Sequence, residues 1–265
     1  MNFSVLMSVY RKENPSFLEE CLVSMQAQTL QATEIVLVQD GPLTPELDAV
    51  IERYAKLLPL KSVKLETNKG LATALNVGLT HCSHEIVARM DTDDVALPER
   101  FEKQIRFMQD NPDIDVVSSW IEERGQTLEP GGFLKRIPAR HEEIVKFSKR
   151  RNPINHPASV YRKSSVLAVG GYPLIFPEDY ALWSCMLVKG YRFANVQEVL
   201  LHMRTGDDFI VRRGLGFFKG ELGLLRFQRS IGFLGLTDLF IYLLIRAIVR
   251  SSPSKMRKLF YAHAR

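Results

Sequence analysis

The sequence predicts an α/β protein with a Rossmann-like, mostly parallel sheet that is flanked by helices. Short apolar runs typical of buried strands alternate with longer segments in which apolar residues recur at helical spacing. This alternation, repeated as far as residue 90, favours a parallel sheet with helices on both faces. The 265 residues suffice for one large domain, and no internal repeat or low-complexity stretch separates two cores.

Each element has its own signal in the chain. The apolar runs predict strands over residues 3–9, 35–38, 63–65 and 86–90. The first helix follows the break Asn14-Pro15, the second follows the turn Gln39–Pro42, and the third covers 70–81. A fourth helix is expected over 99–109. Beyond it the pattern loosens to strands at 116–117 and 158–162 and a helix that starts near Asp179.

The charge is unevenly spread along the chain. The net charge is +5 at pH 7, yet residues 204–265 hold twelve Lys and Arg against four Asp and Glu. This segment therefore carries +8, which leaves −3 for residues 1–203. A basic segment of this kind is suited to an anionic surface.

The three cysteines, Cys21, Cys82 and Cys185, lie far apart and show no metal-ligand spacing. We expect buried free thiols in a reducing compartment. The first residues do not have the basic and apolar pattern of a signal peptide, so a cytoplasmic protein is expected.

Three carboxylates lie in one short turn, Asp91-Thr92-Asp93-Asp94, directly after the apolar run 86–88. Ligands of open α/β sheets bind at this edge, the carboxyl ends of the strands. Closely packed carboxylates repel one another and need a cation, and oxygen ligands suit Mg²⁺ or Mn²⁺. The alternative is a polar loop that caps the next helix. Three acids behind one buried strand favour the ligand site.

A second acidic pair, Glu178-Asp179, lies at the predicted start of a helix. Alone, the pair would be read as a helix cap. It follows the loop Gly170-Gly171, however, and glycines allow a close approach of the backbone to a substrate. A carboxylate at this position is able to act as a general base.

Taken together and in order, these motifs resemble the family 2 glycosyltransferases with the GT-A fold that build bacterial surface polysaccharides. The resemblance runs through residues 3–215. It rests on Met7–Tyr10 with Ser24 and Gln28-Thr29, on Val38–Gly41, on Asn68–Asn76, on Arg89–Asp94 as the DxD motif, and on Glu178-Asp179 with Trp183 as the ED motif.

The resemblance implies an inverting transfer of a hexosyl or N-acetylhexosaminyl group from a nucleotide-diphosphate sugar, with a UDP-sugar expected. Val9, Tyr10 and Asp40 would hold the base, Asp40 by accepting a hydrogen bond from its ring N–H. The nucleotide-sugar side would be lined by Asn68, Lys69, Asn76 and Asp91. The metal, Mn²⁺ or Mg²⁺, would be bound by Asp93 and Asp94, and the general base would be Asp179. The acceptor side would include His156, Glu178 and Trp183.

The chain departs from the family pattern at two places. Gln39 stands where many relatives carry an acid, and a C-terminal metal-binding His of many GT-A enzymes aligns with Gly206 here. Arg204 and Arg212 are the candidates for steadying the diphosphate, because Arg pairs well with phosphate. Their alternative is a solvated basic surface.

The chain is expected to divide into a catalytic domain, 1–215, and a basic, apolar helical tail, 216–265. Residues 231–249 are largely apolar and include two charged residues, Asp238 and Arg246, and both charges would be costly inside a bilayer. An interfacial helix on the inner, anionic face of the cell membrane is one reading, and a helical pair packed on the catalytic domain is the other. A saccharide acceptor linked to a lipid fits the first, and no nucleic-acid partner is expected.

Three function classes are open at this point. The first is the glycosyltransferase. The second is a haloacid-dehalogenase-type phosphatase, because Asp91-x-Asp93-x-Val95 also fits the nucleophile motif of that family, although there the motif lies on the first strand. The third is a non-catalytic, membrane-associated module that binds a nucleotide sugar.

Overall fold

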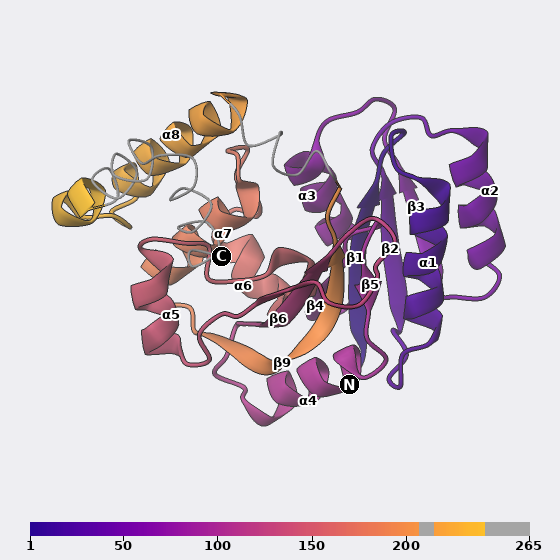
Figure 1. Cartoon of the computed structure of the whole chain (residues 1–265), viewed down its shortest axis with the longest axis horizontal. Helices are drawn as coiled ribbons and strands as arrows, with labels where there is room; N and C mark the ends of the chain where they lie inside the picture. Colours follow the sequence, from indigo (N-terminus) through magenta and orange to yellow (C-terminus); the bar gives the residue numbers. More distant parts are fainter. Residues whose placement is uncertain (207–214, 242–265) are drawn as a thin grey trace.

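A computed structural model describes residues 1–206 and 215–241 of the chain. A curled sheet of nine strands runs through the molecule with helices on both sides (Figure 1). Along the sheet the strands follow the order β3-β2-β1-β4-β8-β6-β9-β5, and β7 pairs with β6 beside this path.

The first half of the sheet is parallel, as the alternating pattern predicts. It comprises β1 (Phe3–Val9), β2 (Glu34–Gln39), β3 (Leu60–Lys64) and β4 (Ile86–Arg89). All pairs among these four strands are parallel. Their carboxyl ends therefore meet at one edge, and the segments that follow β1, β2 and β4 lie together there.

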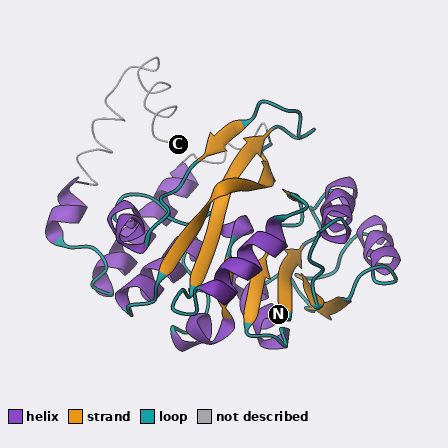
Figure 2. Ribbon diagram, turned by 90° about the horizontal axis from the view of Figure 1, so that it is seen from below, coloured by secondary structure: helices purple, strands orange, loops and turns teal. Residues whose placement is uncertain are grey.

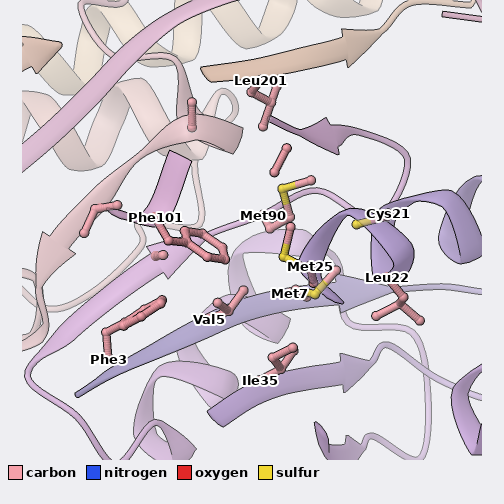
Figure 3. Packing of buried hydrophobic residues seen from close by; sticks show 14 of the residues in the cluster. Phe3, Val5, Met7, Cys21, Leu22, Met25, Ile35, Met90, Phe101 and Leu201 are labelled. Atoms are coloured by element: carbon pink, nitrogen blue, oxygen red, sulfur yellow. The ribbon is translucent and has the colours of Figure 1, made fainter. Parts of the chain in front are cut away.

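Helices cover both faces of this half according to the alternation of side chains along each strand. Val5, Met7 and Val9 face the helices α1 (Pro15–Gln26), α2 (Pro45–Tyr54) and α4 (Arg100–Asp110). Leu6, between them, faces α3 (Leu71–His81) on the opposite side. Figure 3 shows the first of these cores, in which the rings of Phe3 and Phe101 meet edge to face at 5.2 Å between centroids.

The second half of the sheet is mixed, unlike the mostly parallel sheet expected from the sequence. Its strands are β5 (Val95–Ala96), β6 (Val116–Arg124), β7 (Phe133–Lys135), β8 (Val160–Arg162) and β9 (Phe193–Arg204). β8 is antiparallel to both β4 and β6, whereas β6 and β9 are parallel, and the two long strands curl across the sheet in Figure 2. The regular strand and helix order ends after β4, so the connections no longer impose parallel pairing.

Short helices connect these strands on the same side as α3. They are α5 (His141–Ser148), α6 (Lys163–Ala168) and α7 (Glu178–Val188), with a single turn, η1 (His156–Ala158), before β8. The sequence analysis found α7 and missed α5 and α6, which are only 8 and 6 residues long. All three cysteines are free, as expected; Cys185 alone is only partly buried.

The tail begins with α8 (Leu215–Ser230), which packs against α7. Leu225, Phe233 and Leu234 form a small core with Tyr180 and Leu187 of α7. In the residues described, the tail is therefore a packed helical segment. None of the helices described is long and apolar enough to span a bilayer. Of the expected apolar stretch 231–249, residues 242–249 lie outside the described residues.

Gly78 is the point at which α3 approaches the sheet most closely, and it yields a test of the fold. A Cβ atom at Gly78 would lie 2.6 Å from Val38 Cγ2 and closer still to Leu6 Cδ1. We expect Gly78→Ala to destabilise the protein by about 1–3 kcal/mol because the core is overpacked. Chemical denaturation measures this loss.

Gly223, in the middle of α8, is the matched control. No atom lies within 4 Å of a Cβ built there. Gly223→Ala should leave the stability unchanged or raise it by up to about 1 kcal/mol through helix propensity. An equal loss in both variants would contradict this packing of α3.

Candidate active site

Two adjoining hollows lie at the carboxyl ends of β1, β2 and β4. The Asp40 hollow is lined by Ser8, Tyr10, Glu13, Asp40, Asn68, Gly70, Leu71, Asp91, Thr92 and Asp93. The Arg204 hollow is lined by Tyr10, Lys12, Glu13, Asn14, Phe17, Asp91, Asp93, Asp94, Gln126, Met203, Arg204 and Gly206. Tyr10, Glu13, Asp91 and Asp93 belong to both and form the wall between them.

A third depression, the Phe176 groove, continues from the Asp40 hollow. Its lining consists of Lys69, Gly70, Leu71, Ala72, Thr73, Leu174, Ile175, Phe176 and Glu178. Gly70 and Leu71 line both depressions. The groove is largely apolar and carries the Glu178 carboxyl group, so the second acidic motif opens next to the first.

Two buried arginines, Arg89 and Arg100, hold the acidic turn that follows β4. Arg89, fully buried, donates from Nη2 to Asp91 Oδ1 and from Nη1 to the Met90 carbonyl. Arg100 of α4 is also fully buried, and its Nη2 donates to the Arg89 carbonyl at 2.6 Å. The turn is thereby held at both its backbone and its first carboxylate.

Arg204, at the end of β9, holds the other side of the turn. Its backbone N–H donates to Asp94 Oδ1 at 2.8 Å, and its Nε donates to the Asp93 carbonyl at 2.8 Å. Nη2 pairs with Glu20 Oε2 at 2.6 Å, and the guanidinium stacks 3.8 Å from the centre of the Phe17 ring. These protein partners hold the guanidinium in the wall of the Arg204 hollow, and its expected role at the diphosphate stays a prediction.

The negative charge of the turn is only partly compensated: Lys12 and Arg204 line the Arg204 hollow, whereas the residues that line the Asp40 hollow include no Lys or Arg. Burial, then the charges of Asp91 and Glu13, raises the pKa of Asp93 to about 7. Burial and Asp93 likewise raise the pKa of Asp94, whose Oδ2 is buried without a hydrogen-bond partner. A cation between the hollows would relieve this repulsion, and oxygen donors of this kind fit Mg²⁺ or Mn²⁺.

Within residues 1–206 and 215–241, no three His, Cys, Asp or Glu side chains are grouped closely enough to hold a metal ion by themselves. Divalent ions of this type are commonly bound by one or two carboxylates together with substrate phosphates. Asp93 and the free oxygen of Asp94 fit that smaller donor set. His202 is no part of it, since its Nε2 lies 3.5 Å from Glu122 Oε2.

Asp40 joins two loops at the wall of its hollow. Oδ1 accepts from the Lys69 N–H at 2.6 Å and Oδ2 accepts from the Gly70 N–H at 3.0 Å. Asn68 Nδ2 donates to the Asp40 carbonyl at 3.2 Å. Each carboxylate oxygen keeps a second lone pair for a ligand. Gln39 instead donates to Ser62 Oγ of β3 at 2.7 Å, which explains why an amide suffices there.

Glu178 and Asp179 form the first turn of α7. Asp179 Oδ2 accepts from Asn152 Nδ2 at 2.5 Å, and Oδ1 accepts from the Tyr180 N–H at 2.8 Å. Burial, then the neighbouring Asp179 charge, raises the pKa of Glu178 to about 7. The two acids therefore differ in setting: Asp179 is supplied with hydrogen-bond donors, and Glu178 is kept in a poorly solvated groove.

Two residues that were expected on the acceptor side, His156 and Trp183, lie in a buried region behind α7. Trp183 is fully buried, so its side chain contacts no acceptor. The ring of His156 is also buried, and its Nε2 lies 3.1 Å from Tyr172 Oη. Burial lowers the pKa of His156 to about 4, so the ring is neutral at pH 7. Both residues build the support of the ED motif.

Asn76 and Val9 need correction as well. Asn76 donates from Nδ2 to the Tyr172 carbonyl at 2.8 Å and accepts from the Tyr172 N–H at 2.7 Å. Its amide is thus used in joining α3 to the loop before α7. The Val9 side chain is fully buried, and its carbonyl accepts from the Asp40 N–H at 2.8 Å. Arg212 lies outside the described residues.

The sequence analysis missed Glu13, which lines both hollows. Its Oε1 accepts from the Asn14 N–H at 2.8 Å, and its Oε2 accepts from Thr92 Oγ1 at 2.6 Å. An acid four residues after a strand that ends at the ligand edge was the available signal. Phe17 and Gln126 were missed too, and nothing in their sequence context distinguishes them.

Comparisons with known proteins agree with this geometry. Residues 4–169 match the model of glycosyl transferase family 2. The chain is 43% identical over 264 residues to the amylovoran biosynthesis glycosyltransferase AmsE of Erwinia amylovora, covering 98% of this chain and 97% of the relative. It is 38% identical over 261 residues, 98% of this chain and 94% of the relative, to the Escherichia coli UDP-Gal:alpha-D-GlcNAc-diphosphoundecaprenol beta-1,3-galactosyltransferase.

Solved structures support the fold. S. aureus TarS 1-349 in complex with UDP superposes with a TM-score of 0.68 at 18% identity, over 98% of this chain and 78% of that chain. The Pyrobaculum calidifontis mannosyltransferase in complex with GDP-Man and Mn²⁺ gives a TM-score of 0.64 at 16% identity, over 99% of this chain and 79% of that one. The fold is GT-A. With the acidic turn and the ED pair at one edge of this sheet, the chain belongs to glycosyltransferase family 2.

Proposed function

We propose that this glycosyltransferase moves a hexosyl or N-acetylhexosaminyl group from a UDP-sugar to a lipid-linked saccharide, with inversion at the anomeric carbon. The supporting observation is the junction of the depressions. Asp91 and Asp93 line the Asp40 hollow, and Gly70 and Leu71 connect that hollow to the groove carrying Glu178. A donor and an acceptor placed in the two would meet between the acidic motifs.

The donor's nucleotide would occupy the Asp40 hollow. Asp40 would accept the ring N–H of the base through a remaining lone pair, Tyr10 and Asn68 would line the nucleotide, and Lys69 would extend from the same wall. Asp91, held by Arg89, would contact the ribose or the sugar. A structural neighbour solved in complex with UDP and the relative named as a UDP-Gal galactosyltransferase support a uridine donor.

Asp93, with Asp94 Oδ2, would hold Mn²⁺ or Mg²⁺ against the diphosphate. Such an ion neutralises the charge that develops on the leaving nucleoside diphosphate. The unpaired Oδ2 and the raised pKa of Asp93, which burial and neighbouring acids cause, support this assignment.

Asp179 would act as the general base. It would take the proton of the acceptor hydroxyl while that oxygen forms a bond to the anomeric carbon and the bond to the diphosphate oxygen breaks on the opposite face. Attack opposite the leaving group inverts the configuration. The Asn152 and Tyr180 donors hold the Asp179 carboxylate in place, and Glu178 would stand on the acceptor side.

The acceptor would be a saccharide on a lipid diphosphate, at the inner face of the cell membrane. The name of the galactosyltransferase relative supports this substrate class. The described tail presents three exposed apolar side chains, Leu236, Phe240 and Ile241, after α8, which carries Arg226 and Arg229. A surface of this composition fits a lipid interface.

The phosphatase alternative is wrong, because the chain belongs to glycosyltransferase family 2 and the acidic turn follows β4. A binding module without catalysis would bind UDP with metal and release no UDP from a donor and acceptor. Measuring UDP release therefore separates the third class from the enzyme.

The metal assignment predicts the effect of removing one charge. Asp93→Asn should weaken metal-dependent UDP binding at least tenfold and lower kcat/KM by about 10²–10³, since the stabilisation of leaving-group charge is lost. Calorimetry with UDP, with and without Mn²⁺, measures the first effect, and EDTA on the wild type should reproduce it. Asp110→Asn, at an exposed position at the end of α4, is the control. Full activity of Asp93→Asn would reject the assignment.

The base assignment predicts a different pattern. Asp179→Asn keeps the shape of the side chain but cannot take a proton, so kcat should fall by about 10²–10⁴ while the donor affinity changes little. Glu178→Gln, one residue away, should retain most of kcat. If the losses are reversed, Glu178 is the base.

The membrane assignment predicts salt-sensitive binding to anionic vesicles. Each basic residue near such a surface contributes about 1 kcal/mol, and salt screens it beyond about 8 Å. The full chain should co-sediment with anionic vesicles at low salt, and less so at high salt or with neutral lipid. Leu236→Ser with Phe240→Ser should weaken binding, whereas Leu57→Ser, an exposed leucine in the turn that follows α2, should not. No binding by the wild type would refute a lipid interface.

A further inference from the structure

Two hydrogen-bond donors hold the Asp179 carboxylate, and they come from different segments of the chain. Asn152 Nδ2 donates to Oδ2 at 2.5 Å, and the Tyr180 N–H donates to Oδ1 at 2.8 Å. Asn152 lies in the segment that follows α5, whereas Tyr180 lies in the first turn of α7. The position of Asp179 therefore depends on the contacts that fix these two segments.

A series of hydrogen bonds connects the first turn of α7 to the tail. Gln228 of α8 is 2% exposed, and its Nε2 donates to Ser184 Oγ at 2.8 Å. Ser184 is fully buried, and its hydroxyl donates in turn to the Tyr180 carbonyl at 2.7 Å. The Gln228 carbonyl accepts from the Phe233 N–H at 2.8 Å, which fixes the end of α8. Gln228 thus holds the residue whose N–H donates to Asp179.

The tail also contacts the segment that carries Asn152. Lys149, at the end of α5 and three residues before Asn152, donates from Nζ to the Phe233 carbonyl. Its Nζ lies 4.0 Å from the centre of the Phe233 ring. Tyr180 Oη donates to the Ser148 carbonyl at 2.5 Å and so joins α7 to the same end of α5. Both segments that supply donors to the carboxylate are therefore attached to the end of α8.

These attachments bear on catalysis because a general base acts only within hydrogen-bond reach of the proton that it takes. A misplacement of about 1 Å costs about a hundredfold in rate. Asp179 lies in the first turn of α7, and the N-cap residue Pro177 makes no side-chain hydrogen bond to that turn. The contacts with α5 and the tail therefore carry more of the burden of fixing it.

We propose that Gln228 and Lys149 are positioning residues for the general base. Gln228 fixes the Tyr180 side of Asp179, and Lys149 fixes the Asn152 side. The proposal rests on the proposed role of Asp179 as the base. The described segment after residue 215, expected from the sequence as a tail beside the catalytic domain, would then be a working part of the active site.

Two substitutions test the Tyr180 side. Gln228→Met keeps the approximate length of the side chain and removes its donor, so kcat should fall about fivefold or more because the base is less well placed. Ser184→Ala interrupts the same series of bonds by removing one oxygen atom, and it should lower kcat in the same way. Calorimetric affinity for UDP with Mn²⁺ should stay within about twofold in both, since the donor hollow is not involved.

The Asn152 side is tested by a pair of substitutions at one position. Lys149→Met removes the charge and the hydrogen bond to the Phe233 carbonyl, so kcat should fall with little change in UDP affinity. Lys149→Arg keeps a cation and a donor toward Phe233 and should restore most of kcat. Equal losses in the two variants would contradict the role of this contact.

A double-mutant cycle separates positioning of the base from general support of the fold. If Gln228 acts through Asp179, Gln228→Met should cause no further loss of kcat in the Asp179→Asn background. The same fold-loss in both backgrounds overturns the proposal. Unchanged kcat in Gln228→Met, Ser184→Ala and Lys149→Met overturns it as well.

Ser165→Ala is the matched control for Ser184→Ala. Ser165 of α6 is also buried, and its hydroxyl donates to Asp115 Oδ1 at 2.7 Å, directly before β6. Its loss should lower the melting temperature and leave kcat unchanged. A fall in kcat equal to that of Ser184→Ala would mean that kcat follows stability alone, against the proposal.

The same measurements distinguish this proposal from the proposed function. Wild-type protein that releases no UDP from a donor and an acceptor contradicts both. Full kcat in Asp179→Asn contradicts the assignment of the base, and the positioning role with it. An active wild type and an impaired Asp179→Asn, together with normal kcat in the Gln228 and Lys149 variants, contradict the positioning role alone.

Discussion

Three carboxylates in one four-residue turn constitute the constraint around which this molecule is organised. Left to themselves Asp91, Asp93 and Asp94 would repel one another, and burial raises the pKa of Asp93 and of Asp94. Arg89, Arg100 and Arg204 come to the turn from β4, α4 and β9. Each binds backbone carbonyls as well as acting as a charge, so the turn is held in shape and its electrostatic strain is only partly relieved. The repulsion between carboxylates that remains lies on the side of the hollows.

The same contacts join the two halves of the sheet. The parallel half supplies the turn and Asp40, and the mixed half supplies Arg204 through β9 and the ED support through η1 and β8. Because β8 runs antiparallel beside β4, Ser159 is brought next to Arg89 and the His156 turn is brought behind the acidic motif. The mixed pairing is therefore a condition for the site, since a fifth parallel strand would place different residues there.

The first half of the fold could be predicted from the sequence, because its strands are continuous apolar runs and its helices carry regular stripes. β9 could not, since its middle residues are polar and exposed and break the pattern of a strand. Among the site residues, Asp40, Asp91 and Asp93 follow recognisable strands and line the hollows at the expected edge. Arg204 was recognised as important, but its partners Glu20 and Phe17 lie far away in the sequence, and no local pattern reveals that they occupy its guanidinium. Trp183 was assigned to the acceptor by motif, and only burial reveals that it is core.

The bonds of Asp40 have a consequence for how a ligand is received. Its two oxygens tie the ends of β2 and the start of α3 together through Lys69 and Gly70, and Gly41 lies so close that a Cβ there would be 2.7 Å from the Asn68 nitrogen. Because hydrogen bonds and close packing already fix this wall, a ligand bound against it would incur little entropic penalty for ordering the protein. The hollow is preorganised, and it selects its ligand by fixed shape. A nucleotide base bound here as proposed would therefore have to fit backbone that cannot move without breaking the start of α3.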